Sequence, residues 1–195
     1  MNLSGIYSKE YMEGDLMPLV DNERRIIKKI KSGNQPAFKQ LYDSYADYAL
    51  RTTYAITRNH NHAADIVQET FIKVYRNIDQ FDQKRPFKPW FYQILLNESR
   101  RYMKRQNKQA TAVESEELMD YLHEQNSGQE NYDNLDRALD QLSEMHRTVL
   151  TLKYMNEFTE REIAQLLELN VNTVKSRLYK GRKQLKEVIG GVGDE

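Results

Sequence analysis

The chain has 195 residues, which suffices for one or two domains with at least one substantial hydrophobic core. Its 39% apolar and 30% charged residues indicate a soluble globular protein, no apolar run approaches the roughly 20 residues of a membrane span, and the N-terminus does not resemble a signal peptide. The absence of cysteine excludes disulfides and thiolate metal sites, and the four histidines form no metal-binding pattern. We therefore expect a cytoplasmic protein with no metal, no cofactor and no direct membrane insertion.

The formal net charge of zero hides a strong segregation of charge along the chain. Residues 24–108 hold 18 basic and 7 acidic residues (+11), residues 109–140 hold 1 and 9 (−8), and residues 141–189 hold 9 and 6 (+3). Two basic blocks separated by an acidic one indicate two nucleic-acid-facing modules, joined by a segment that does not face nucleic acid.

The first quarter of the chain predicts an extension followed by two helices. Residues 1–22 show no sustained periodicity and are interpreted as an acidic N-terminal extension, interrupted near its end by Pro18. A short basic helix is expected over 23–31, closed by residues 32–34. Aromatic and apolar residues then repeat at spacings of three and four, which predicts an amphipathic helix over 35–56 and a loop at 58–61.

The next predicted helix, 62–80, has a sharply two-sided pattern. Its expected buried seam consists of Ala64, Val67, Phe71, Val74 and Ile78. The opposite side carries polar and charged residues: Asp65, Gln68, Glu69, Lys73 and Arg76. This polar side is either merely solvated or binds a partner.

The stretch after a loop at 81–86, FKPWFYQILLNESRRYMKRQNK, predicts a helix whose first turn tolerates Pro89. Its far end is strongly cationic, with Arg100, Arg101, Lys104, Arg105 and Lys108. Aromatic rings beside a cationic helix suit single-stranded nucleic acid, because cations follow the backbone and exposed rings stack on bases. Cations in a last helical turn also favour the helix dipole, but five exceed that need.

Residues 106–133 lose apolar periodicity and gain acidic residues, which indicates a flexible linker. Periodicity returns from Leu135 to Leu152, where we expect two helices separated near Ser143. The second of these is expected to end at residues 156–158. No strand-like alternation occurs anywhere, so the predicted fold is all-α.

The C-terminal stretch predicts a helix-turn-helix. Thr159 and Glu162 form a capping-box pattern that begins one helix, and Asn170 is placed to cap a second. The second helix exposes a cationic face with side chains that can donate to phosphates and base edges: Asn172, Thr173, Lys175, Ser176, Arg177, Tyr179, Lys180, Arg182 and Lys183. The alternative is a solvated basic face on an ordinary core helix.

This order of motifs resembles a bacterial extracytoplasmic-function (ECF, group 4) sigma factor of the sigma-70 family. Three stretches carry the resemblance: region 2.2 is similar to AADIVQETFIKVYRNIDQF (63–81), regions 2.3 and 2.4 to RPFKPWFYQILLNESRRYMKR (85–105), and region 4 to LSEMHRTVLTLKYMNEFTEREIAQLLELNVNTVKSRLYKGRKQL (142–185). The chain departs from the family pattern at four positions. Ala64 stands where an acidic residue is usual, Arg101 where Asp is usual, Ser143 where Pro is usual and Glu168 where Gly is usual.

The resemblance implies two small helical domains. A sigma2-like bundle would occupy 23–106 and a sigma4-like helix-turn-helix 134–189, joined by the flexible acidic linker 107–133. The 1–22 extension and a 190–195 tail would flank them.

The resemblance also implies a promoter-specificity subunit of RNA polymerase, with no enzymatic activity of its own. The implied partner is core RNA polymerase, including its β′ clamp helices and β flap. The polymerase-binding residues, on the helix that would meet the β′ clamp helices, would be Asp65, Ile66, Gln68, Glu69 and Phe71. The −10 element would be bound by Trp90, Tyr92, Asn97, Arg100, Arg101, Lys104 and Arg105. The −35 element would be bound by Asn172, Thr173, Lys175, Ser176, Arg177, Tyr179, Lys180 and Arg182. An anti-sigma factor, often membrane-bound in this family, is expected to hold the protein inactive.

Two other functions stay open on the residues alone. A stand-alone helix-turn-helix transcription factor explains residues 135–186 equally well, but not the aromatic and basic segment 85–108. An all-α nucleic-acid-processing enzyme is disfavoured, because the sequence shows no paired carboxylates, Gly-rich phosphate loop or nucleophile and base at recognisable spacing.

Overall fold

A computed structural model describes residues 16–110 and 138–190. The first fifteen residues of the predicted extension, residues 111–133 of the predicted linker and residues 191–195 of the tail lie outside the described residues. Every regular element in the described part is helical, which confirms the all-α prediction. The elements are α1 (Leu16–Lys31), α2 (Gln35–Thr57), α3 (His60–Asn77), a 3₁₀ turn (Ile78–Gln80), α4 (Phe87–Ala110), α6 (Glu144–Tyr154), α7 (Glu160–Leu167) and α8 (Val171–Gly190).

Helix α1 begins inside the predicted extension, at Leu16 rather than at residue 23. The sequence interpretation treated Pro18 as an interruption, but the structure places it in the first turn of α1. A first-turn N–H has no partner within the helix, so its absence in proline costs little there. The helix buries Ile26, Ile27 and Ile30 against the rest of the bundle.

Asparagine caps set where α2 and α3 begin. The side chain of Asn34 accepts a hydrogen bond from the N–H of Ala37 at 2.9 Å, and that of Asn59 accepts one from His62 at 3.0 Å. The predicted buried seam of α3 is shifted by one residue at its start, because Ala63 is fully buried and Ala64 is exposed. The rest of the seam is buried as predicted.

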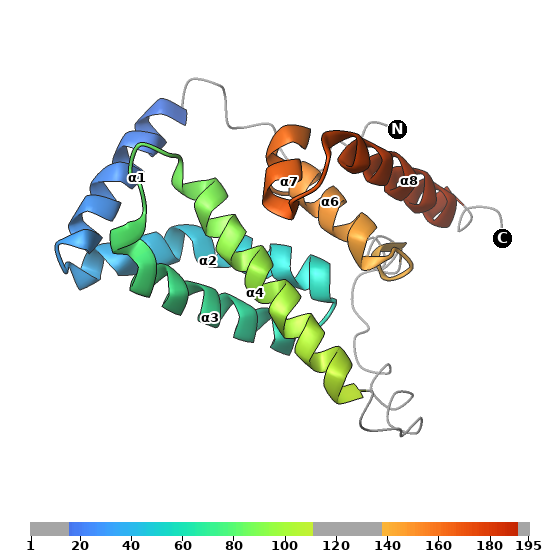
Figure 1. Ribbon diagram of the computed structural model, residues 1–195, viewed down its shortest axis with the longest axis horizontal. Coiled ribbons are helices and arrows are strands. Elements are labelled where there is room, and N and C mark those ends of the chain that lie inside the picture. The colour runs from blue at the N-terminus through green and yellow to red at the C-terminus, as the bar shows by residue number, and fades with distance from the viewer. Residues whose placement is uncertain (1–15, 111–137, 191–195) are drawn as a thin grey trace.

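Helix α4 supplies the largest side chains to the core of the bundle. Phe87 and Phe91 are almost fully buried, and their rings pack on Tyr45 with centroids 5.3 and 4.9 Å apart. Aromatic packing of this kind stabilises beyond the buried area alone. The end of α4 projects beyond the bundle (Figure 1).

Side-chain caps begin all three C-terminal helices, and those of α7 and α8 were predicted from the sequence. Ser143 accepts a hydrogen bond from His146 N–H at the start of α6, which explains a serine where the family has proline. The Thr159–Glu162 capping box is present at α7, and Asn170 accepts a bond from Asn172 N–H at 2.8 Å to begin α8. Both cap predictions are confirmed.

Helices α1–α4, here the N-terminal group, lie beside α6–α8, the C-terminal group, with α4 passing next to α7 (Figure 1). We call this contact between the groups the closed arrangement. The buried apolar side chains of both groups form one continuous cluster. None of the helices in residues 16–110 and 138–190 combines the length and the apolar character that crossing a bilayer requires.

Candidate polymerase and promoter interfaces

The exposed side of α3 presents acceptor groups. Asp65 and Gln68 are exposed, and the side chain of Glu69 is 39% exposed. Asp65 also accepts a hydrogen bond from the hydroxyl of Tyr102 on α4, at 3.3 Å. The structure therefore presents the polar part of the predicted polymerase-binding set to solvent on one helix face.

The two apolar residues of that set, Ile66 and Phe71, are instead core residues, 1% and 4% exposed. The Phe71 ring lies under the exposed ring of Tyr42, with centroids 4.6 Å apart. Phe71 can therefore support a surface aromatic residue, whereas its own ring does not reach the surface in the closed arrangement. The sequence interpretation included Tyr42 in the aromatic and apolar repeat of the 35–56 helix but assigned it to no binding site.

Arg101 belongs to an ion-pair network between α3 and α4. Its guanidinium lies 2.7 Å from Glu98 Oε2 and 3.6 Å from Glu69 Oε1. Glu98, whose side chain is only 7% exposed, also pairs with Lys73 on α3. Because Arg101 stands where the family usually has Asp, this network gives the departure a structural role: the arginine neutralises two acids.

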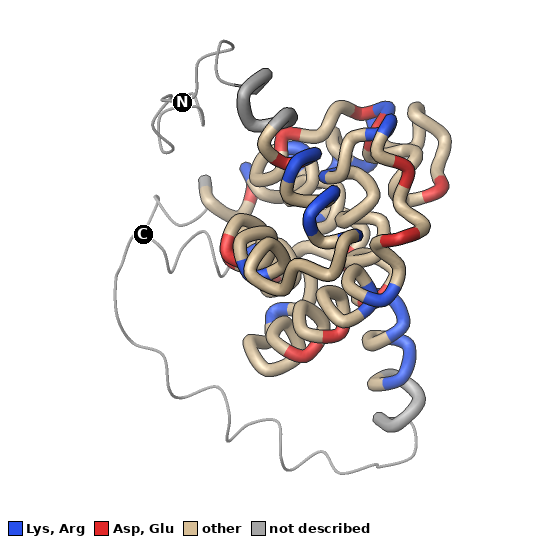
Figure 2. Tube along the Cα trace, turned by 90° about the vertical axis from the view of Figure 1, so that its left-hand side faces the viewer, with Lys and Arg blue, Asp and Glu red and all other residues tan. Residues whose placement is uncertain are grey.

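Three of the predicted DNA-binding cations of α4 share one helix face with Asn97. Asn97, Arg100, Lys104 and Arg105 are all exposed, at spacings that place them on one side at 100° per residue. Figure 2 shows blue segments gathered along the projecting end of α4, beside the grey trace. This face is a cationic track of the kind that follows a nucleic-acid backbone.

The two aromatic residues predicted to contact DNA differ in placement. Trp90 is partly exposed, packs on Phe81 at 4.9 Å, and shares the helical phase of Asn97 and Lys104. Tyr92 lies two residues further, about 200° around the helix, and is only 1% exposed. Its burial raises the pKa of the phenol to about 12. In the closed arrangement the Tyr92 ring is not accessible to a DNA strand. The helical period alone puts Tyr92 and Trp90 on different sides of α4.

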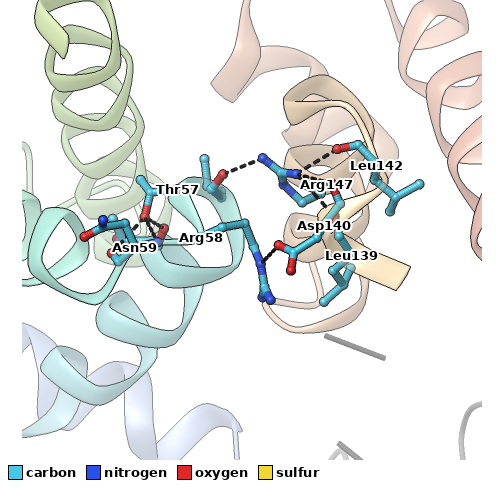
Figure 3. A network of polar contacts seen from close by, with 9 residues as sticks. Thr57, Arg58, Asn59, Leu139, Asp140, Leu142 and Arg147 are labelled. Atoms are coloured by element: carbon cyan, nitrogen blue, oxygen red, sulfur yellow. Dashed lines mark hydrogen bonds and ion pairs between the residues drawn. The ribbon is translucent and has the colours of Figure 1, made fainter. Parts of the chain in front are cut away.

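The border between the two groups has a polar edge. Figure 3 shows Arg58, which follows α2, pointing at Asp140, and Arg147 of α6 lying against Leu139 and Leu142. The Arg58–Asp140 pair has an N–O distance of 2.6 Å, and Arg147 donates to the backbone carbonyls of Leu142 and Ile56. Burial lowers the pKa of Arg147. These contacts tie the end of α2 to the C-terminal group.

The centre of the border involves four side chains to which sequence reasoning gave no role: Asn156, Thr52, Lys88 and Gln93. Asn156, 3% exposed, contacts Thr52 of α2 and Tyr92 of α4. Lys88 of α4 donates to the Asn156 carbonyl at 2.8 Å. Further along α4, Gln93 and Arg100 both donate to the carbonyl of Leu166, at 3.3 and 3.4 Å. Nothing in the local pattern around Asn156 indicates this role, since its partners are distant in sequence.

Helix α8 presents most of its predicted DNA-reading face outward. Asn172, Ser176 and Tyr179 are exposed, and Tyr179 is 65% exposed. The predicted cations flank this line: Lys175, Lys180 and Arg182 are exposed, while Arg177 is half-buried. Thr173 is also half-buried. Lys175 lies 4.0 Å from Glu160, and Arg182 donates to the Tyr154 hydroxyl at 3.2 Å.

A cleft of about 150 Å³ lies where the groups meet, lined by Ile56, Leu96, Ser99, Arg100, Glu144, Met145, Thr148, Leu167, Leu169 and Arg177. It contains one cation from each predicted DNA-binding helix, Arg100 and Arg177. The two surfaces predicted to bind promoter DNA therefore partly face each other in the closed arrangement. Over the described ranges, no group of three or more His, Asp or Glu side chains is placed to hold a metal ion.

Comparison with known proteins identifies the family. Residues 41–109 match Sigma-70 region 2 and residues 132–185 match Sigma-70, region 4. The ECF RNA polymerase sigma factor SigW of Bacillus subtilis (strain 168) is 32% identical over 177 residues, which cover 84% of this chain and 95% of SigW.

Two solved structures share the fold. The sigma factor RpoE, in complex with the anti-sigma factor NepR from Bartonella quintana, has a TM-score of 0.66 at 24% identity, covering 81% of this chain and 98% of RpoE. CnrH, in complex with the cytosolic domain of CnrY, has a TM-score of 0.64 at 24% identity, covering 88% and 98%. The two matched regions and the SigW relationship establish that this chain belongs to the sigma-70 family, in its extracytoplasmic-function class.

Proposed function

We propose that this chain is a group 4 ECF sigma factor, the dissociable subunit that brings core RNA polymerase to promoters in the cytoplasm and leaves RNA synthesis to the core enzyme. The observation that carries this is the pairing of an acceptor-rich face on α3 with a cationic face on the adjacent α4 of one bundle. A stand-alone DNA-binding protein has no use for the first of these faces.

The division of labour follows from the charges. The Asp65, Gln68 and Glu69 acceptors of α3 suit basic groups on the β′ clamp helices, and such contacts mainly set orientation and specificity. The cationic face of α4 suits the opened −10 strand, with Trp90 as a partly exposed ring for stacking. Helix α8 enters the −35 duplex in the major groove, where each good bidentate base contact discriminates by about 1–3 kcal/mol.

The proposed domains are a sigma2-like unit over 23–106 and a sigma4-like unit over 134–189, and the start of α1 at Leu16 supports moving the first boundary earlier. The β flap would bind the sigma4-like unit. An anti-sigma factor is the expected inhibitor, by similarity to RpoE, whose structure contains the anti-sigma factor NepR.

Binding both promoter elements at once requires the two groups to separate. The −10 and −35 elements are separate sites along the DNA, and each helical turn of duplex between them adds about 34–36 Å. In the closed arrangement Arg100 of α4 is within 3.4 Å of the Leu166 carbonyl of α7. The closed arrangement is therefore a state that precedes promoter binding.

The test is a pull-down with core polymerase followed by transcription from promoters selected out of a randomised library. The double variant Asp65→Ala, Glu69→Ala should lose most polymerase binding while keeping its helicity. A matched control, Asp43→Ala with Asp47→Ala, removes two exposed acids from α2 and should bind normally. Unchanged binding by the α3 variant removes this helix from the role, and tight duplex footprinting without polymerase favours the stand-alone transcription factor.

A further inference from the structure

We propose that the turn between α6 and α7, residues 155–158, is an internal latch. It covers Lys88 and Tyr92 of α4 and holds the two groups in the closed arrangement until core polymerase or DNA replaces its contacts. The regulatory meaning of the latch rests on the proposed function, because it assigns α4 to the promoter strand. The closure itself does not depend on that assignment.

Asn156 is the centre of the latch. Its side-chain Nδ2 donates to Thr52 Oγ1 at 2.9 Å and to Tyr92 Oη at 2.7 Å, so a single amide joins α2 and α4 to the C-terminal group. Its backbone carbonyl accepts from Lys88 Nζ at 2.8 Å. Asn156 and Thr52 are buried, so loss of the amide leaves polar groups without these partners inside the border.

Phe158 completes the cover over α4. Its ring lies edge-on to that of Tyr92, with centroids 5.1 Å apart. Lys88 Nζ lies over the Phe158 ring, 5.1 Å from its centroid. Between the two latch residues, Glu157 adopts a left-handed backbone conformation at φ +59°, which non-glycine residues rarely adopt. The turn is thus held in an unusual shape that directs Asn156 and Phe158 at the same stretch of α4.

The chemistry of these contacts suits a reversible closure. When the groups separate, water replaces the partners in the hydrogen bonds of Asn156. These bonds therefore contribute little net free energy to closure, although their geometry is specific. The groups that opening would release on α4 are a cation, an amide and a phenol, namely Lys88, Gln93 and Tyr92. These can bond to the phosphates and bases of a single strand. The strand therefore competes with the turn for Lys88 and Tyr92, and with the Leu166 carbonyl of α7 for Gln93.

The chain contains no cysteine, so a labelled pair can report the closure without background. Spin labels on Asp43→Cys of α2 and Glu187→Cys of α8 occupy exposed positions in the two groups, and pulsed electron resonance measures their separation in the full-length free protein. In this background Asn156→Ala should shift the ratio of open to closed protein on the order of tenfold. Thr52→Val, which removes the partner hydroxyl from the other group, should shift it in the same direction, and Gln40→Ala on the exposed side of α2 is the control.

A second readout is acylation of Lys88 measured by mass spectrometry. Lys88 should react slowly in the wild type and several-fold faster in both latch variants, with exposed Lys39 as the internal standard. Equal distances and equal Lys88 reactivity in the wild type and both variants, with unchanged circular dichroism, would overturn the latch.

A DNA arm adds a single-stranded A- and T-rich oligonucleotide. If the oligonucleotide slows acylation of Lys88 in the latch variants, the strand competes for this side chain. If acylation stays fast with the oligonucleotide present, the latch is supported, but the proposed promoter role of this part of α4 is overturned.

Discussion

Arg101 on α4 lies 3.6 Å from Glu69 on α3, so a residue predicted to bind promoter DNA contacts a residue predicted to bind polymerase. The same guanidinium also holds Glu98 at 2.7 Å. One arginine therefore connects the two proposed functional faces of the bundle. A family member with Asp at this position would place a third acid beside Glu69 and Glu98.

We predict that Arg101 orients Glu69 for polymerase more than it binds DNA. Arg101→Ala should weaken polymerase binding, and a double-mutant cycle with Glu69→Ala should show a coupling of about 0.5–1 kcal/mol in stability, because both side chains are partly exposed and screened. Arg101→Asp should destabilise more, through repulsion with Glu98. Denaturant unfolding measures the coupling, and titration with polymerase measures binding. If Arg101 and Glu69 show no coupling and Arg101→Ala strongly reduces binding of single-stranded DNA, Arg101 acts mainly in DNA binding.

The outward face of α8 predicts how promoter choice changes. Lys175→Ala should relax the −35 preference that the holoenzyme shows in a library of promoters randomised at that element, because an exposed cation at the start of the helix is lost. Arg177→Ala should do the same once the groups have separated, since Arg177 lines the cleft between them in the closed arrangement. The matched variant Lys39→Ala on α2 should select the wild-type sequences, and identical selection by all three proteins contradicts the role of α8.

The helix-turn-helix contains a backbone position where glycine should stabilise it. Glu168 ends α7 in the left-handed conformation, at φ +56°, where the family usually has Gly. Glu168→Gly should raise the free energy of unfolding by about 1 kcal/mol, because glycine adopts this conformation without the steric cost of a Cβ. Glu168→Ala is the control: it removes the same charge but keeps the Cβ. Equal urea midpoints for the two variants would show that charge, and not backbone conformation, decides the effect.

The sequence predicted local structure better than it predicted contacts between the two groups. Except for α1, which begins at Leu16 instead of residue 23, periodicity and the predicted caps placed the helix starts within a few residues, because Thr159 and Asn170 act on their own helix ends. It did not predict that Tyr92 would be buried, because that burial depends on Asn156 and Phe158, which reach α4 only when the two groups meet. Periodicity identifies a helix face, whereas the partner of that face is decided by side chains far away in the chain.

Glu23 of α1 predicts a pH dependence of stability. Burial raises the pKa of its carboxyl, partly offset by the hydrogen bond that the Tyr45 hydroxyl donates to it. A raised pKa means that the folded state favours the protonated acid, so this contribution to stability is complete below the unfolded value near 4.5 and is lost as pH rises through the higher folded value. Glu23→Gln keeps the acceptor for Tyr45 without the charge, and should raise the melting temperature at pH 7.5 more than at pH 4.5. Glu187→Gln, at an exposed position on α8, should show no such difference, and a Glu23→Gln effect equal at both pH values would contradict the assignment.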